Sequence, residues 1–152
     1  MNVPHETVAE RLDRIAAEFT ELDPRERLEA LLEYADGLTP LPPELRAEVD
    51  RNDHRVHECQ TPVFIWASVS QGRARLVAEV APEAPTVKGF VGVLVEAFHD
   101  APVEEVLAAG AGVAQRLGLG EALGMLRTRG LAAIERYIRV RLERAASSTP
   151  GE

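Results

Sequence analysis

The chain has 152 residues, a length typical of one domain with a hydrophobic core of ordinary size. Apolar residues make up 45% of it and charged residues 28%, which is the composition of a soluble globular protein. The formal net charge of −8 argues against nucleic acid as the main partner, because phosphate binding needs a basic surface.

The expected compartment follows from three further features of the chain. No apolar run approaches the roughly 20 residues that a membrane-spanning helix needs, and MNVPHETVAE at the start lacks the basic and apolar stretches of a secretory signal. Cys59 is the only cysteine, so an internal disulfide cannot form. We therefore expect a protein of the reducing cytoplasm, with no membrane partner.

Two amphipathic helices are predicted at the start of the chain. Over residues 6–19, apolar side chains recur at spacings of three and four, which places them on one helical face. In the second helix Asp23 is the predicted N-cap, Pro24 fits the first turn, Glu26 completes a capping box and Gly37 ends the helix. The predicted buried stripe of this second helix is Leu28, Leu31, Leu32 and Ala35.

The middle of the chain predicts a small antiparallel sheet. Residues 62–70, PVFIWASVS, are typical of a strand that is buried on both faces. Residues 73–80 alternate in polarity and follow a short turn, Gln71-Gly72, so the two runs predict a hairpin. We expect residues 54–58, HRVHE, to form a third strand that reverses into the second over residues 59–62.

Helices are predicted again in the second half. Residues 87–98 are apolar nearly all round, which is typical of a core helix. A short helix is expected after Pro102, and short helical pieces over residues 110–120. A last helix has Thr128 as its candidate N-cap, and residues 146–152 are a predicted disordered tail. Its predicted buried face is Leu131, Ile134, Ile138 and Leu142.

These elements predict an α+β fold in one domain that spans residues 1–152, with a core over about 6–145. Helices come first, a small three-stranded antiparallel meander follows, and further helices pack on one face of the sheet.

Cys59 is open to several interpretations. Free cysteines are usually buried and inert, yet this one lies at a predicted strand reversal among polar residues, where function often concentrates. His54, His57 and Cys59 have the spacing H-x2-H-x-C, but a structural zinc usually needs four ligands with paired cysteines. His57 as the base of a hydrolytic pair lacks an acidic partner and an oxyanion loop. The remaining histidines, His5 and His99, belong to no recognisable metal motif.

Three motifs occur in order around this cysteine. The first is V-x-x-C-Q-T-x-V-F-I, which contains Cys59 and runs into the apolar strand. The second is TVKG, residues 86–89, at the start of the apolar helix, and the third is LRTRGL, residues 126–131, at the start of the last helix. In this order and spacing, over roughly residues 6–145, they resemble the SufE family of sulfur-acceptor proteins, with Arg127 and Gly130 at the matching places.

The resemblance implies a SufE/NifU-like fold and a carrier of sulfur. Cys59 is expected to take persulfide sulfur from a SufS-like cysteine desulfurase, to stimulate that enzyme, and to deliver the sulfur to a SufB-like iron–sulfur scaffold. The pyridoxal phosphate belongs to the desulfurase, so we expect no cofactor and no metal on this chain, which acts as a carrier and activator rather than a stand-alone enzyme. We also expect a monomer or a weak dimer. The alternative is a non-catalytic adaptor with an inert buried cysteine.

The resemblance also implies which residues support the cysteine. Arg127 is expected to stabilise the thiolate, because a nearby cation favours that form of cysteine. The family buries this cysteine in an apolar cavity, and the candidate walls are strand residues 63–66 and the helix from Val87. Glu58 stands where many members have glycine, and Leu126 where serine is common. The other expected supporting residues are His57, Glu58, Gln60, Glu83 and Lys88.

Overall fold

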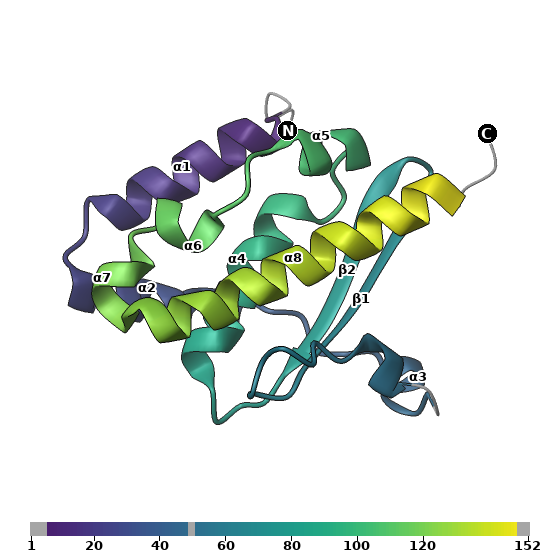
Figure 1. Cartoon of the computed structure of the whole chain (residues 1–152), viewed down its shortest axis with the longest axis horizontal. Coiled ribbons are helices and arrows are strands. Elements are labelled where there is room, and N and C mark those ends of the chain that lie inside the picture. The colour runs from purple at the N-terminus through teal and green to yellow at the C-terminus, as the bar shows by residue number, and fades with distance from the viewer. Residues whose placement is uncertain (1–5, 49–50, 149–152) are drawn as a thin grey trace.

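Helices pack against one face of a β-hairpin in this computed structural model, which describes residues 6–48 and 51–148 (Figure 1). In chain order the elements are α1 (Val8–Thr20), α2 (Pro24–Asp36), α3 (Pro43–Arg46), a 3-10 turn η1 (Arg51–His54), β1 (Val63–Ser70), β2 (Arg73–Val80), α4 (Pro85–Phe98), α5 (Val103–Ala108), α6 (Val113–Arg116), α7 (Leu119–Leu123) and α8 (Met125–Ser148). The α+β class is confirmed, with helix as the dominant element.

Helix α2 begins at the predicted capping box. The Asp23 carboxylate accepts the N–H of Glu26 at 2.8 Å, and the Glu26 carboxylate accepts the N–H of Asp23 at 3.0 Å. The predicted buried stripe is wrong at Leu32, whose side chain is 44% exposed. Arg27 is buried instead, because α7 packs on α2 and the guanidinium donates to the carbonyls of Phe19 and Gly118.

The hairpin forms as predicted around Gln71-Gly72. Both turn residues have positive φ, which gives the type I′ turn that matches the twist of a two-residue hairpin. One face of the hairpin is buried, and it consists of Val63, Ile65, Ala74, Leu76, Ala78 and Val80. The opposite face of β1 is half-buried or exposed, so the prediction that this strand is buried on both faces is wrong.

The sheet has two strands, and the predicted third strand over residues 54–58 is wrong. Residues 51–54 form a 3-10 turn, and the chain turns again from His57 onward. An isolated bridge between Arg55 and Phe64 and a hydrogen bond from Val56 to Val63 join this segment to β1. A segment that bends at both ends cannot extend far enough to pair as a strand.

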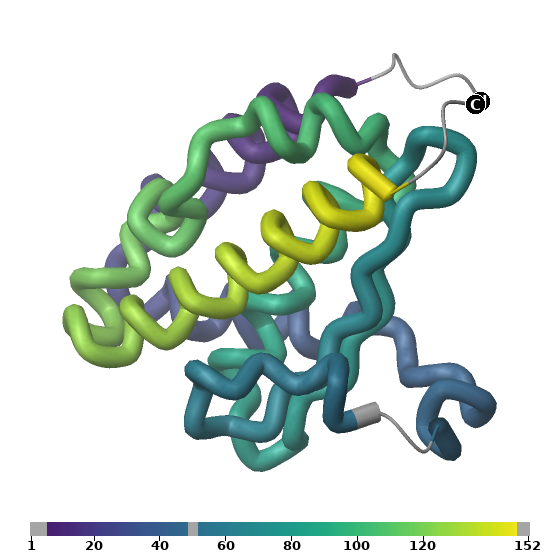
Figure 2. Tube along the Cα trace, turned by 45° about the vertical axis from the view of Figure 1, so that its right-hand side comes forward, coloured from purple at the N-terminus to yellow at the C-terminus, as the bar shows by residue number. Residues whose placement is uncertain are grey.

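Helices α4 and α8 cover the hairpin, α4 along β2 and α8 along β1 (Figures 1 and 2). Helix α2 packs on α4, and the short helices α5, α6 and α7 pack on α8. Helix α8 therefore contacts almost every part of the second half of the chain. Within the described residues, no helix has both the length and the apolar character to cross a membrane.

The ends of α8 differ from those expected. The helix begins at Met125, after Gly124 with a φ of +83°, so Thr128 lies inside it and the predicted N-cap is wrong. The Thr128 hydroxyl donates to the carbonyl of Gly124 at 2.6 Å. The helix continues to Ser148, so residues 146–148 are helical and not part of a tail. Residues 149–152 lie outside the described part of the chain.

Helices α2 and α4 touch through their backbones. A Cβ atom at Gly89 would lie 2.2 Å from the carbonyl oxygen of Leu31, and one at Gly92 would lie 2.5 Å from that of Tyr34. Backbone atoms in a packed helix pair cannot move aside without separating the helices. Gly89, the last residue of the TVKG motif, is therefore needed for the packing of α4 on α2.

Substitution of this glycine tests the contact. We expect Gly89→Ala to lower the free energy of unfolding by about 2 kcal/mol, because the added methyl group must push α4 away from α2. Urea denaturation measures the change. Gly120→Ala is the control, since nothing lies within 4 Å of a Cβ at that helical position. Equal stabilities of the Gly89→Ala variant and the wild type would contradict the proposed close contact.

Candidate functional site

Cys59 lies in a short loop whose two ends are joined by a hydrogen bond. The N–H of Val56 donates to the carbonyl of Val63 at 2.9 Å, and both valines are fully buried. Inside the loop, the N–H of Cys59 donates to the carbonyl of Val56 at 3.2 Å. The N–H of Ala81 donates to the carbonyl of Pro62 at 3.2 Å. The loop is thus attached to both strands where the open end of the hairpin lies.

Cys59 turns inward while its neighbours face solvent. The cysteine is 8% exposed and packs with the hydrophobic core, whereas His57, Glu58 and Gln60 are exposed. Glu58 is not among the residues with positive φ, so the loop does not require at this position the glycine that is common in the family. The loop places the sulfur inside and the polar side chains outside.

A pocket of about 810 Å³ opens over Cys59. Its walls are the loop at residues 58–61, the turn and helix start at residues 83–87, and the first turns of α8 from Leu126 to Arg136. Strand residues 63–66 do not line it, so that predicted wall is wrong, because Val63 and Ile65 lie in the core below the loop. Val87 lines it as expected.

Most of the predicted site residues come together at this pocket. The residues that line it are Glu58, Cys59, Gln60, Glu83 and Arg127. His57 is exposed on the loop and Lys88 is half-buried in the first turn of α4, and neither lines the pocket.

Two arginines that the sequence reasoning missed also line the pocket. They are Arg129 and Arg136, both on α8 with Arg127. Arg136 follows Arg129 by seven residues, which places both on the same face of a helix two turns apart. That spacing relates the two arginines to each other, but nothing in it relates them to Cys59.

The histidines do not converge on the cysteine. His54 stacks on Trp66 with 4.8 Å between ring centroids, and His57 is exposed. His99 accepts a backbone N–H of β2 at 3.0 Å, while His5 lies outside the described residues. In the described part of the chain, no group of three or more His, Cys, Asp and Glu side chains is arranged to hold a metal ion.

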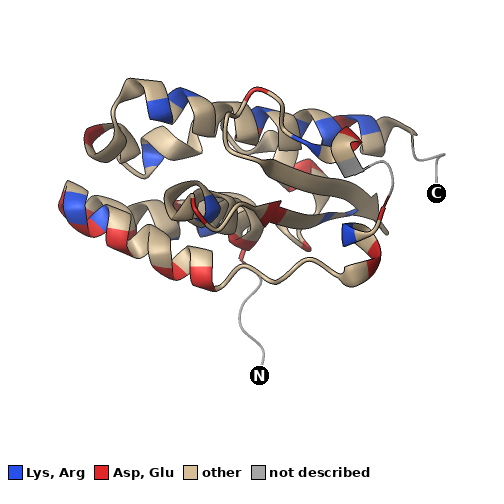
Figure 3. Cartoon of the chain, turned by 90° about the horizontal axis from the view of Figure 1, so that it is seen from below, with Lys and Arg blue, Asp and Glu red and all other residues tan. Residues whose placement is uncertain are grey.

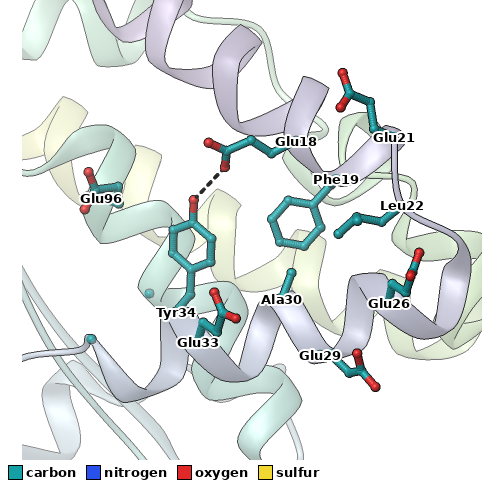
Figure 4. A pocket seen from close by; sticks show the side chains of 12 residues that line it. Glu18, Phe19, Glu21, Leu22, Glu26, Glu29, Ala30, Glu33, Tyr34 and Glu96 are labelled. Atoms are coloured by element: carbon teal, nitrogen blue, oxygen red, sulfur yellow. Dashed lines mark hydrogen bonds between the residues drawn. The ribbon is translucent and has the colours of Figure 1, made fainter.

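A second pocket, of about 720 Å³, lies between α1, α2 and α4 and is acidic (Figure 4). Its carboxylates are Glu18, Glu21, Glu26, Glu29, Glu33 and Glu96. The Tyr34 hydroxyl donates to Glu18 at 3.4 Å, and burial, with Glu18 and Glu96 nearby, raises the pKa of Tyr34 to about 12. None of the residues that line this pocket is a cysteine, histidine, lysine or arginine, so the pocket at Cys59 is the candidate site.

Helix α8 also holds the segment that leads into the Cys59 loop. The Tyr137 hydroxyl donates to the carbonyl of Asp53 at 3.3 Å, and the Arg141 guanidinium donates to the same oxygen. The Arg141 guanidinium carbon lies 4.8 Å from the centroid of the Tyr137 ring. Burial raises the pKa of Tyr137 further above neutral pH.

Loss of this anchor is expected to expose the thiol more often. In the variant Tyr137→Phe with Arg141→Gln, Cys59 should react with a thiol reagent about fivefold faster, since the two lost hydrogen bonds share one acceptor and together contribute about 1 kcal/mol to holding the segment. The measurement is the pseudo-first-order rate of labelling of the native protein.

Arg144→Gln is the matched control, because Arg144 is exposed on the same helix and has no part in the anchor. Equal labelling rates in the anchor variant and this control would show that the Asp53 contact does not restrain the loop.

Comparisons with known proteins agree with the resemblance of the three sequence motifs around Cys59. The SufE family model, described as an Fe-S metabolism associated domain, matches residues 13–142. Uncharacterized SufE-like proteins from two strains of Mycobacterium tuberculosis are each 33% identical over 135 residues, which cover 88% of this chain and 92% of theirs.

Two further matches come from other kinds of organism. A chloroplastic quinolinate synthase from Nicotiana tabacum is 30% identical over 106 residues, which are 69% of this chain and 14% of that protein. The solution structure of a hypothetical protein from Thermus thermophilus has a TM-score of 0.77 and 37% sequence identity to this chain. That match covers 95% of this chain and all of the other.

Proposed function

The chain belongs to the SufE family, and we propose that it is a sulfur acceptor in Fe-S metabolism whose working group is Cys59. The observation that carries this proposal is the position of the thiol. It lies 8% exposed beside a pocket of about 810 Å³, in a loop whose other side chains face outward. In this proposal residues 1–152 act as one SufE-like domain in a reducing cytoplasm.

The proposed chemistry is an exchange between sulfur atoms. The Cys59 thiolate attacks the outer sulfur of a persulfide on a SufS-like cysteine desulfurase. The S–S bond of the donor breaks, the desulfurase thiolate leaves with the electron pair, and Cys59 becomes the persulfide. A thiolate of a SufB-like scaffold then takes the outer sulfur in the same way. Cleavage of the C–S bond stays with the pyridoxal phosphate of the desulfurase.

The environment of Cys59 suits a carried persulfide. A persulfide is lost to solvent thiols and oxidants, and burial of the sulfur slows both reactions. A second thiol nearby would expel the sulfur and form a disulfide, whereas this chain has no other cysteine. One buried cysteine is therefore sufficient for the carrier and protects its cargo.

The mouth of the pocket offers a docking surface for the desulfurase. Met125 is 74% exposed and Leu126 is 81% exposed at the start of α8, so two large apolar side chains lie next to each other on the surface there. Leu126 lines the pocket together with Arg127. A partner that covers this rim buries apolar area and brings its own persulfide to Cys59.

The alternative function is a non-catalytic adaptor, in which Cys59 is an inert core residue. Its support is that Cys59 packs with the core as an ordinary buried thiol does. The pocket beside the sulfur favours the carrier, because an inert cysteine needs no access from solvent.

Sulfur loading separates the two functions. After incubation with a cysteine desulfurase and free cysteine, the intact mass of the chain should increase by one sulfur atom, and the desulfurase should turn over faster. The Cys59→Ser variant should show neither effect. An unchanged mass together with an unchanged turnover would leave the adaptor as the better account.

Arg127 is expected to assist the transfer. Arg127→Ala should slow sulfur acceptance by about fivefold, since one partly solvated cation near the sulfur stabilises the thiolate by up to about 1 kcal/mol. The rate of mass gain measures the effect, and urea denaturation checks that the fold is intact. Arg144→Ala, on the exposed part of α8, is the control. Wild-type rates in Arg127→Ala would remove its proposed role.

A further inference from the structure

The pocket over Cys59 contains charges that the rest of the chain does not neutralise. Three guanidinium groups line it from α8, those of Arg127, Arg129 and Arg136. Two carboxylates line it from the other walls, Glu58 on the loop and Glu83 on the turn before α4. Within the described residues none of these five side chains forms a hydrogen bond or an ion pair. Cations and anions thus lie on separate walls of one pocket.

Two of the other three arginines of α8 are bonded to the protein itself. Arg139 donates to the carbonyls of Val106 and Gly110 and to the carboxylate of Glu135, and Arg141 donates to the carbonyl of Asp53. Among the described residues Arg144 is the remaining arginine of α8 without such a bond, so three of the four unbonded guanidinium groups of this helix line the pocket.

The position of these cations is also unusual for this chain. The formal net charge is −8, and the acidic residues of α2 lie on the other side of the molecule from the basic residues of α8 (Figure 3). The three arginines that line the pocket with Cys59 thus form a local concentration of positive charge on an acidic protein, and it attracts a carboxylate.

We infer that this pocket binds a free amino-acid thiol, with cysteine as the simplest member, and that Cys59 persulfide passes its sulfur to it. A zwitterionic amino acid carries an ammonium and a carboxylate on one carbon atom. Its carboxylate can face the guanidinium wall while its ammonium faces Glu58 and Glu83. Its thiol is then left to approach Cys59.

The size and lining of the pocket fit a small molecule. A volume of about 810 Å³ lies within the range of roughly 300 to 1,000 Å³ that is typical of small-molecule sites. Val87, Leu131 and Ala132 give the pocket an apolar part, against which the methylene and sulfur of the ligand can pack.

The transfer step rests on the proposed function, because it starts from Cys59 persulfide. The thiolate of free cysteine attacks the outer sulfur, and a new S–S bond forms between those two atoms. The S–S bond to Cys59 breaks, and the Cys59 thiolate leaves with the electron pair. The products are free cysteine persulfide and unloaded protein, so the step needs no oxidant or reductant.

Binding is tested first on the unloaded protein, with three probes that cannot exchange sulfur. They are S-methylcysteine, 3-(methylthio)propionate, which lacks the ammonium, and 2-(methylthio)ethylamine, which lacks the carboxylate. Titration of the isotope-labelled chain, followed by backbone amide shifts, gives the affinity and the location. We expect S-methylcysteine to bind in the millimolar range at residues 58–61 and 126–136, and each of the other probes to bind more weakly.

Variants that each remove one charge, from opposite walls of the pocket, test the two proposed contacts of the ligand separately. Glu83→Gln and Arg136→Gln should each weaken the binding of S-methylcysteine by about twofold to fivefold. Glu143→Gln and Arg144→Gln, exposed on α8 outside the pocket, are the matched controls. Equal affinity for the three probes, no saturable shifts at the pocket, or binding that both pocket variants retain would overturn the inference.

Transfer is tested with Cys59 loaded chemically by inorganic polysulfide, without a desulfurase. Free cysteine should unload the wild type faster than it unloads Glu83→Gln or Arg136→Gln, while 3-mercaptopropionate should distinguish the wild type from Glu83→Gln much less. Intact mass against time gives the rates. If Cys59 is loaded but free cysteine shows no such selectivity, the inference is overturned and the sulfur-acceptor function stands. If the desulfurase fails to load Cys59, the proposed function fails and the result of the binding titration is unaffected.

Discussion

The hydrogen bond between the N–H of Val56 and the carbonyl of Val63 decides where the sulfur lies. It joins two fully buried residues, so water cannot compete for it, and it closes the loop that carries Cys59. Within the closed loop the N–H of Cys59 donates to the carbonyl of Val56, and the Cys59 side chain turns into the core. The same contact places β1 below the loop, so the pocket is walled by α8 and the turn before α4.

Helix α8 connects this loop to the rest of the molecule. Its buried face packs on β1 and on the short helices, its first turns line the pocket, and its middle holds the carbonyl of Asp53 through Tyr137 and Arg141. Helix α4 is placed by its backbone contact with α2 at Gly89. The position of each wall therefore depends on packing that is distant from the sulfur.

The arrangement explains how a SufE-family protein can carry a reactive sulfur with one cysteine. In the proposed function burial of Cys59 protects the persulfide, and the pocket still gives a reacting thiol access to it. In the further inference the charges on the walls of the pocket select among small molecules, while the exposed apolar start of α8 is the proposed contact of the desulfurase. In these two proposals a protein donor and a small acceptor reach the same sulfur, distinguished by which part of the same surface they contact.

Local patterns in the sequence determined most of the elements. Helical periodicity, the capping box at Asp23 and the Gln71-Gly72 turn each involve residues a few positions apart, so the sequence alone predicts the helices, the hairpin and the motifs around Cys59. Only the tertiary structure decided that residues 54–58 do not form a strand, that Cys59 turns inward, and that Arg129 and Arg136 share its pocket. Those features depend on contacts between segments that are distant in the chain, and such contacts leave no periodic signal in the residues that make them.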